Sequence, residues 1–315
     1  MNKANILLYH GVTDNKYPFG IENWSGKHIY VDVFEEQMKY ISENKKVCTL
    51  RELSSMLQSE DPCPPDCVAV TFDDSFKNVR TVALPVLKKY NIPATFFVTT
   101  GMVDNDRLFW VDRLEHMINH HKHDFFYFRG TCYSTCYLSH RQEVLCKLKK
   151  QMKDLPPKER YEMLDELEGI LGWKDASEVK NYKTLSWDEV ADLDDPPMYE
   201  VGGHTVNHEI LSYLTPEEAK YEIKSCLDVL EDKLGRKVSL FSYPEGQEKH
   251  YNDTVISLLK DEGVVVCPSA IEGDNFDGED PFHLKRNMVG FVGGEFPFEE
   301  SNSTNTCEKK LVSSS

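Results

Sequence analysis

The sequence predicts an α/β fold in which short buried strands alternate with longer amphipathic helices. Short runs rich in Val, Ile, Phe and Tyr have the length of strands, and several are apolar throughout, which is typical of strands buried on both faces. Segments with apolar residues at helical spacing lie between these runs. Strands that alternate with helices form the βα units of a parallel sheet or barrel.

The predicted elements can be given residue ranges. Pro216–Leu234 is the clearest helix, because Thr215 can cap its start, Glu218 completes a capping box, and Gly235 ends it. The other predicted helices are Val33–Glu43, Val79–Tyr90 and Asp253–Glu262. The predicted strands are Ile6–Tyr9, Val68–Phe72, Ala94–Thr99, Glu200–Gly203, Val238–Tyr243, Val264–Cys267 and one near His283–Val289.

One long segment interrupts the alternation. Residues 108–183 are charged and helical in pattern, with no strand indicated after Tyr127–Phe128. We therefore expect a single domain over residues 1–300, with a helical insertion at about 108–183 that covers one side of the sheet or forms a cap. Residues 301–315 are polar and low in complexity, which predicts a disordered tail.

Composition excludes several classes of partner. The chain has 315 residues and a net charge of -17, which argues against nucleic acid and against anionic membranes. It has no apolar run of the roughly 20 residues that span a bilayer, so we expect no transmembrane segment. Ile6–Tyr9 is shorter than the core of a signal peptide, so we expect a cytoplasmic protein. The oligomeric state stays open.

Polar residues follow several predicted strands at the point where each strand ends. Asp73 and Asp74 end the stretch VTFDDSF, His10 follows Ile6–Tyr9, His204 follows Glu200–Gly203, and Tyr243 ends another strand. Function in parallel α/β folds lies at the carboxyl ends of the strands. We therefore expect these groups to face one crevice.

The stretch HTVNH predicts a metal site. His204 and His208 can reach one cation if the segment is helical or tightly turned, and an aspartate is a natural third ligand. Three protein ligands with an open position are typical of hydrolytic sites, where the metal lowers the pKa of a bound water towards about 7. In this interpretation Asp74 binds the metal and Asp73 is the general base. His10 is the candidate acid, and a histidine bonded to backbone is its alternative reading.

Two other groups could bind metal. HMINHHKH holds His116, His120, His121 and His123, and a solvated helix end is the simpler interpretation. The nine cysteines include two pairs with CxxxC spacing, which could form a four-thiolate zinc site. Reduced, partly buried thiols are the simpler interpretation of these cysteines, which are Cys63, Cys67, Cys132 and Cys136.

The stretches VAVTFDDSFKNV, GGHTVNH and FSYPEG resemble the polysaccharide deacetylase family, the NodB-homology group of carbohydrate esterases. The resemblance covers about Ile6 to Val289 apart from the insertion. ILLYHGV is similar to the start of a subgroup in which the motif with the acid histidine lies at the N-terminus. The family implies a distorted (β/α) barrel, a divalent metal, most often zinc with cobalt, nickel or manganese as alternatives, and hydrolysis of N-acetyl groups on amino sugars.

The resemblance assigns roles to residues. Asp73 matches the base, His10 the acid, and Asp74, His204 and His208 the metal ligands. Tyr243 falls where the family uses a backbone N–H to hold the oxyanion, and Pro244 and Gly246 would shape that loop. Ser242 stands where the family often has an arginine that steadies the base, and Arg286 could replace that arginine. Glu245 adds an acid where many relatives have a neutral or aromatic residue.

These features together predict a metal-dependent hydrolase that removes an N-acetyl or other N-acyl group from an amino sugar. A soluble or lipid-linked glycan precursor is the expected substrate, since the chain shows no export signal. The alternatives are hydrolysis of a non-sugar amide on the same scaffold, and a carbohydrate-binding relative that has lost turnover.

Overall fold

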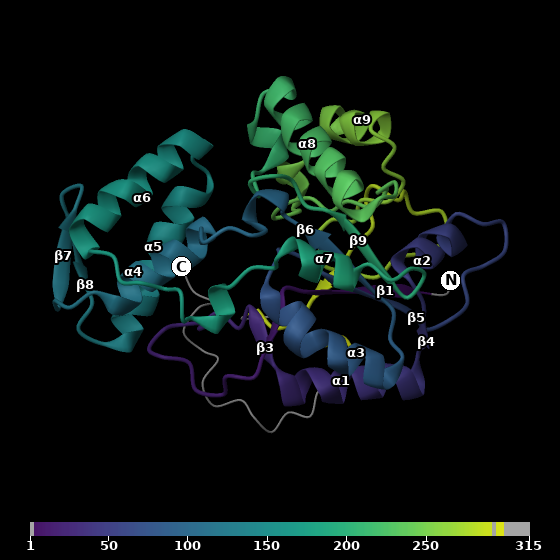
Figure 1. Ribbon diagram of the computed structural model, residues 1–315, viewed down its shortest axis with the longest axis horizontal. Helices are drawn as coiled ribbons and strands as arrows, with labels where there is room; N and C mark the ends of the chain where they lie inside the picture. Colours follow the sequence, from purple (N-terminus) through teal and green to yellow (C-terminus); the bar gives the residue numbers. More distant parts are fainter. Residues whose placement is uncertain (1–2, 292–293, 299–315) are drawn as a thin grey trace.

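The computed structural model describes residues 3–291 and 294–298 of the chain, and its centre is a parallel sheet (Figure 1). The strand order is β10-β1-β5-β6-β9, and β4 pairs with β5 beside β6. The first strand, β1, therefore lies between the last strand and β5. The strands are β1 (Ala4–Tyr9), β4 (Lys46–Val47), β5 (Cys67–Phe72), β6 (Ala94–Val98), β9 (Tyr199–Gly203) and β10 (Asn287–Met288).

The sheet continues past β9 through single bridges. Gly203 pairs with Phe241, and Leu240 pairs with Val266, both in parallel. The predicted strands at Val238–Tyr243 and Val264–Cys267 are therefore wrong as continuous strands. Cys267 N and Ser269 N donate hydrogen bonds to the carbonyl oxygens of residues 281 and 284, which lie in a later loop. These contacts with the loop replace the row of hydrogen bonds that a continuous strand would make with a neighbouring strand. The result is an α/β fold in the form of a distorted (β/α) barrel, as predicted.

Helices cover the outside of the sheet. In Figure 1, α8 and α9 lie on one side of it and α1 and α3 on the other. The predicted capping box is confirmed: Thr215 accepts from Glu218 N, and Gly235 ends α8 in the left-handed conformation at φ 66°. These helices are α1 (Val31–Asn44), α2 (Leu50–Leu57), α3 (Leu84–Tyr90), α7 (Trp187–Leu193), α8 (Pro216–Leu234) and α9 (Asp253–Asp261).

Apolar burial explains why these segments form strands and helices together. All six residues of β1 and all six of β5 are buried, since one face packs on the outer helices and the other on α2 and on apolar residues across the barrel interior. A short parallel pair, β2 (Gly11–Thr13) with β3 (His28–Tyr30), lies between β1 and α1 in the chain. The last predicted strand is shorter than expected, since only Asn287–Met288 pairs with β1.

The segment 108–183 forms a lobe beside the sheet (Figure 1). Its helices are α4 (Trp110–His120), α5 (Leu138–Lys153) and α6 (Pro157–Leu171), and they share a hydrophobic cluster separate from the main core. It also holds a hairpin of β7 (Phe125–Phe128) and β8 (Thr131–Ser134), so the expectation of no strand after Phe128 is wrong. Residues 301–315, where we predicted a disordered tail, lie outside the described residues.

Within residues 3–291 and 294–298, no helix combines the length and the apolar composition needed to cross a bilayer.

Candidate active site

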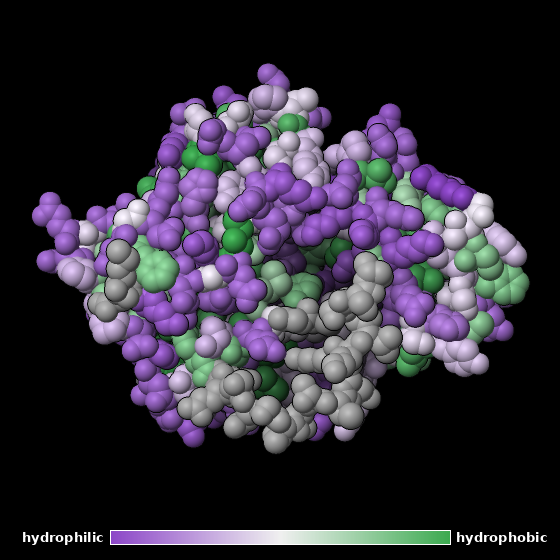
Figure 2. All heavy atoms as spheres, turned by 180° about the vertical axis from the view of Figure 1, so that it is seen from behind, coloured by the Kyte–Doolittle hydropathy of each residue, from purple (hydrophilic) through white to green (hydrophobic). Residues whose placement is uncertain are grey.

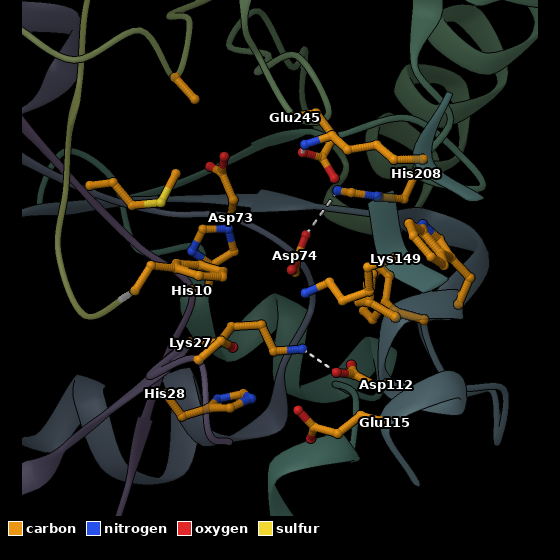
Figure 3. A pocket seen from close by; sticks show the side chains of 18 of the residues that line it. His10, Lys27, His28, Asp73, Asp74, Asp112, Glu115, Lys149, His208 and Glu245 are labelled. Carbon is orange, nitrogen blue, oxygen red and sulfur yellow. Dashed lines mark hydrogen bonds and ion pairs between the residues drawn. The ribbon is translucent and has the colours of Figure 1, made fainter. Parts of the chain in front are cut away.

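The carboxyl ends of β1, β5 and β9 open into a cavity of about 500 Å³ (Figure 3). His10 follows β1, Asp73 and Asp74 follow β5, and His204 and His208 follow β9, and all five line this cavity. The side chains that the sequence placed at separate strand ends therefore converge. Aligned carboxyl ends of parallel strands explain the convergence.

Asp74, His204 and His208 are spaced to bind one ion. His208 Nε2 lies 3.1 Å from Asp74 Oδ1, and His204 Nε2 lies 3.7 Å from the same oxygen. One ligand atom from each residue lies within 4.8 Å of the others. One carboxylate and two imidazoles are a common ligand set for a catalytic divalent ion such as zinc.

A tight turn, not a helix, brings the two histidines together. Thr205 and His208 both have left-handed backbone conformations, at φ 65° and 59°. Thr205 Oγ1 accepts a hydrogen bond from His208 N at 2.9 Å, which closes the turn. Asp74 is also left-handed, at φ 67°, a conformation that aspartate adopts more readily than most residues.

Glu222 holds this turn against α8, and the sequence interpretation missed it. Its Oε2 accepts hydrogen bonds from Val206 N and Asn207 N, each at 2.8 Å. Its Oε1 accepts from Asn207 Nδ2 at 2.7 Å. Glu222 is buried on a face of α8 next to Ile223. A charged residue on that apolar face was the available signal.

His204 is oriented for metal binding by its other ring nitrogen. Its Nδ1 lies 2.9 Å from the carbonyl oxygen of Ser242, so Nδ1 carries the proton and donates, and Nε2 is free towards the cavity. Burial lowers the pKa of His204 to about 4, which keeps the ring neutral. A neutral imidazole with a free Nε2 is the form that binds a metal, so these residues fit a divalent ion.

Asp73 is buried and faces a fully buried arginine. Arg286 donates from Nη1 to Oδ1 at 2.8 Å and from Nη2 to Oδ2 at 2.7 Å, a bidentate pair. Ser242 Oγ donates to Oδ1 at 3.3 Å. Burial raises the pKa of Asp73, but the charge and hydrogen bonds of Arg286, together with the charges of His204 and His10, outweigh burial, so the pKa lies below its usual value. The contact between Arg286 and Asp73 suggested by the sequence is present.

His10 faces the same cavity. Its Nδ1 is buried and has no hydrogen-bond partner in the described part of the chain, so backbone does not hold this nitrogen. Its ring packs edge-to-face against Phe291, with centroids 4.8 Å apart. Burial lowers the pKa of His10, whereas the negative charges of Asp74 and Asp73 act in the opposite direction.

Tyr243 differs from the expectation that its polar group faces the crevice. Its hydroxyl donates to the carbonyl oxygen of Phe282 at 3.1 Å, and its ring stacks on Tyr251 with centroids 4.1 Å apart. The hydroxyl of Tyr243 therefore does not face the crevice, because its ring is packed in the barrel core. The roles of the Tyr243 backbone N–H, Pro244 and Gly246 in holding an oxyanion stay predictions.

The alternative metal groups are not assembled in the described residues. The triad of Asp74, His204 and His208 is the one set there with metal-binding spacing. His116 Nε2 contacts the carbonyl oxygen of Lys174, and His120 Nδ1 contacts that of His116. Cys63 and Cys67 are buried, whereas Cys132 and Cys136 are exposed on and after the hairpin.

The far wall of the cavity was not predicted. Lys27 lies between β2 and β3 and pairs with Asp112 of α4. Lys149 of α5 also lines the cavity, and Lys153 pairs with Glu245. The lysines of α5 look like a solvated helix face in sequence, so nothing there indicated that this face borders the site. Glu245 stands where many relatives have a neutral or aromatic residue, and its negative charge is paired with Lys153 of the segment 108–183.

Comparison with known protein families matches residues 60–155 and 158–267 to the family described as polysaccharide deacetylase. The chain belongs to the polysaccharide deacetylase family. The matched residues include Asp73, Asp74, His204, His208 and Tyr243. His10 and Arg286 lie outside the matched range, and they stand directly after β1 and directly before β10.

Two curated relatives show the extent of sequence similarity. The chain is 32% identical over 124 residues to poly-beta-1,6-N-acetyl-D-glucosamine N-deacetylase of Staphylococcus aureus, covering 36% of this chain and 41% of that enzyme. It is 30% identical over 121 residues to the Bacillus subtilis protein YxkH, covering 38% and 39%. The match spans about two fifths of the length of these relatives.

Solved structures share the fold at lower identity. The deacetylase PplD of Streptococcus pyogenes, in complex with acetate, has a TM-score of 0.58 at 19% identity, covering 91% of this chain and 92% of that chain. IcaB from Ammonifex degensii has the same TM-score and identity, covering 91% of each chain. These likenesses support the distorted (β/α) barrel.

Proposed function

We propose that this chain is a metal-dependent hydrolase that removes an N-acetyl or other N-acyl group from an amino sugar. The observation that carries the proposal is the content of one cavity. It holds a carboxylate and two imidazoles spaced for one ion, a second carboxylate paired with Arg286, and His10. Metal-assisted amide hydrolysis uses three groups of this kind: an ion that polarises the carbonyl, a base that takes a proton from water, and an acid that protonates the leaving amine.

Asp74, His204 and His208 would hold the ion, most often zinc in this family. The bound ion supplies Lewis acidity, which polarises the amide carbonyl and makes water easier to deprotonate. Glu222 and Ser242 would position two of these ligands. Glu222 holds the turn that carries His208, and Ser242 fixes the orientation of the His204 ring.

Asp73 would accept the proton of the attacking water. The Arg286 pair keeps Asp73 ionised and fixes the direction of its oxygens, although the pair also makes the carboxylate a weaker base. His10 would donate a proton to the leaving nitrogen, so that the amine departs in a neutral form. Its Nδ1 has no hydrogen-bond partner in the described residues, which supports a role for this nitrogen in proton transfer.

An amino-sugar conjugate is the substrate class that the relatives favour. The Staphylococcus aureus relative is named for poly-beta-1,6-N-acetyl-D-glucosamine. In this chain α4 and α5 supply one wall of the cavity. A glycan precursor or glycoconjugate with its amino sugar at an accessible position fits such a walled cavity.

A pair of variants tests the division of labour. Asp74→Ala removes a ligand and should lose bound metal and activity together. Asp73→Asn keeps the ligand set and should keep the metal, while acetate release from N-acetylated sugars falls by about 10²-fold or more. Metal content by elemental analysis and acetate release would be measured on the same preparations. A fully active, metal-containing Asp73→Asn enzyme would contradict the assignment of the base.

A further inference from the structure

The wall of the cavity opposite the candidate metal ligands carries two lysines of α5 that have no close ion-pair partner among the described residues. Lys149 and Lys150 of α5 line the cavity, and neither makes an ion pair with any described residue. Figure 3 shows the side chain of Lys149 pointing into the cavity from the insertion. Figure 2 shows a hollow in the surface whose upper edge is formed largely by hydrophilic residues.

The acidic residues of the cavity already have partners. Asp73 pairs with Arg286, Asp112 with Lys27, and Glu245 with Lys153. Asp74 belongs to the ligand set. Positive charge at this wall therefore remains available to a ligand, although the chain as a whole has a net charge of -17.

Glu115 balances the charge of Lys149 only in part near neutral pH. Its carboxylate accepts hydrogen bonds from Tyr182 Oη at 2.9 Å and from Asn23 N at 3.2 Å. Burial, helped by the negative charge of Asp112, raises the pKa of Glu115 to about 7. The Glu115 carboxyl is therefore about half protonated near neutral pH, and its hydrogen bonds go to Tyr182 and Asn23.

The surroundings of Lys149 disfavour its charged form, and a bound anion would stabilise that form. Burial and the nearby charge of Lys27 lower the pKa of Lys149, and the negative charges of Glu115, Asp112 and Glu245 offset this only in part. The Lys27 ammonium is fixed by its pair with Asp112 and by the ring of Phe76, 4.4 Å away. Two ammonium groups that repel each other at one wall are typical of a site for a negatively charged group.

Unsatisfied polar atoms mark the same wall. Asp112 Oδ2 and His28 Nε2 are buried and have no hydrogen-bond partner in the described part of the chain. Both residues line the cavity, and each is more than nine-tenths buried. Buried polar atoms without partners are costly, so these two are available to the hydroxyl groups of a bound sugar.

We infer that the substrate carries an anionic group, a carboxylate or a phosphate, which Lys149 binds while the N-acyl group lies at the metal ligands. This inference rests on the proposed function, because it names the class of amino sugar that the enzyme takes. A cavity of about 500 Å³ holds both groups of an acidic amino sugar. Lys150, which is more exposed, adds positive charge at the rim.

Binding measurements on the metal-containing enzyme test the inference. The probes are N-acetylglucosamine, N-acetylglucosamine 1-phosphate and N-acetylglucosaminuronic acid, compared by calorimetry at low ionic strength. The wild-type chain should bind at least one of the charged sugars about tenfold or more tighter than the neutral sugar. The two charged probes distinguish phosphate from carboxylate.

The Lys149→Gln variant should reduce this preference to within about twofold. Lys147→Gln is the matched control, since Lys147 lies on the same helix, is exposed, and places its ammonium over the ring of Tyr133. It should bind all three probes like the wild type. A charge preference that survives in Lys149→Gln would mean that the metal or another group holds the anion, and would overturn the inference. Equal binding of all three sugars by the wild type, or no binding of the charged ones, would also overturn it.

Acetate release from the same probes separates the two proposals. Anion preference that depends on Lys149, without acetate release from any probe, would contradict the proposed hydrolysis and leave the anion site standing. Acetate release without any charge preference would support the hydrolysis and contradict the anion site.

Discussion

Asp73 illustrates how single residues define this site. It and Asp74 are adjacent in sequence, yet one carboxylate faces two imidazoles and the other faces a guanidinium. The difference in partners, not in residue type, separates the proposed metal ligand Asp74 from the proposed base Asp73. Arg286 is therefore the residue on which the role of Asp73 depends most.

Arg286→Met should destabilise the protein strongly. The substitution leaves the Asp73 carboxylate buried without its guanidinium, and breaking a buried pair in this way costs about 3–5 kcal/mol. The free energy of unfolding, measured with urea, checks this. Combining Arg286→Met with Asp73→Asn should restore part of the loss, because the buried charge is then gone. An equal loss in the single and double variants would show that packing, not charge, is responsible.

Glu115→Gln should stabilise the protein in a way that depends on pH. The pKa of Glu115 is about 7 in the folded chain, against an ordinary value of 4.5. Between pH 4.5 and about pH 7, Glu115 keeps its proton in the folded state and has lost it in the unfolded state. Its contribution to the free energy of unfolding therefore becomes more unfavourable as the pH rises through this range. The variant should exceed the wild type by roughly 3 kcal/mol at pH 8 and by less than about 1 kcal/mol at pH 5.

Urea unfolding at the two pH values measures this difference. Glutamine keeps the acceptor oxygen that Tyr182 and Asn23 use, so the comparison isolates the charge. The same stability difference at pH 5 and pH 8 would contradict the shifted pKa.

Residues at strand ends could be predicted from the sequence, whereas their supporting contacts could not. Asp74, His204 and His208 stand in short motifs whose residue types are metal ligands. Glu222 and Lys149 are ordinary helix residues in sequence. Which face of a helix borders the site depends on tertiary packing, which local patterns do not encode.

At the scale of elements, the end of β9 is closely packed where it borders the site. A Cβ on Gly203 would lie 2.6 Å from the ring of Phe241 and 3.2 Å from Cys226 Sγ. Gly203 therefore allows the strand to approach its neighbours closely just before His204. The position of that ligand depends on this close packing.

Gly203→Ala should lower stability by about 1–3 kcal/mol through overpacking. It should also weaken metal binding, since the displaced strand end carries His204. Gly169→Ala is the matched control, because Gly169 is an exposed position of α6 with nothing within 4 Å of an added Cβ. It should be neutral or stabilising by about 0.5–1 kcal/mol. Thermal unfolding and metal titration of both variants check this, and unchanged metal affinity in Gly203→Ala would contradict the coupling.

Elements with local signals were predicted best. The helix Pro216–Leu234 has the predicted bounds, because a capping box and a left-handed glycine define its ends locally. The strands after β9 were predicted less well, because strand pairing depends on partners far away in sequence. Hydrogen bonds from Cys267 and Ser269 to residues 281 and 284 could not be inferred from apolar runs.

At the scale of the whole molecule, the barrel supplies the reactive groups and the insertion supplies the opposite wall. The barrel could be predicted from the alternation of strands and helices together with the family resemblance. The insertion was found as a break in that alternation, but its contacts with the cavity required the structure. The ion pair of Lys153 with Glu245 joins the two parts at the edge of the site.

The most direct test of the central claim is to measure metal content and acetate release together on the wild-type protein. N-acetylated sugars would be assayed before chelation, after chelation, and after the divalent ion is restored. We expect about one ion per chain, loss of acetate release on chelation, and its recovery on reconstitution. Acetate release that persists after complete removal of the metal, or a reconstituted protein that binds no ion, would contradict the account.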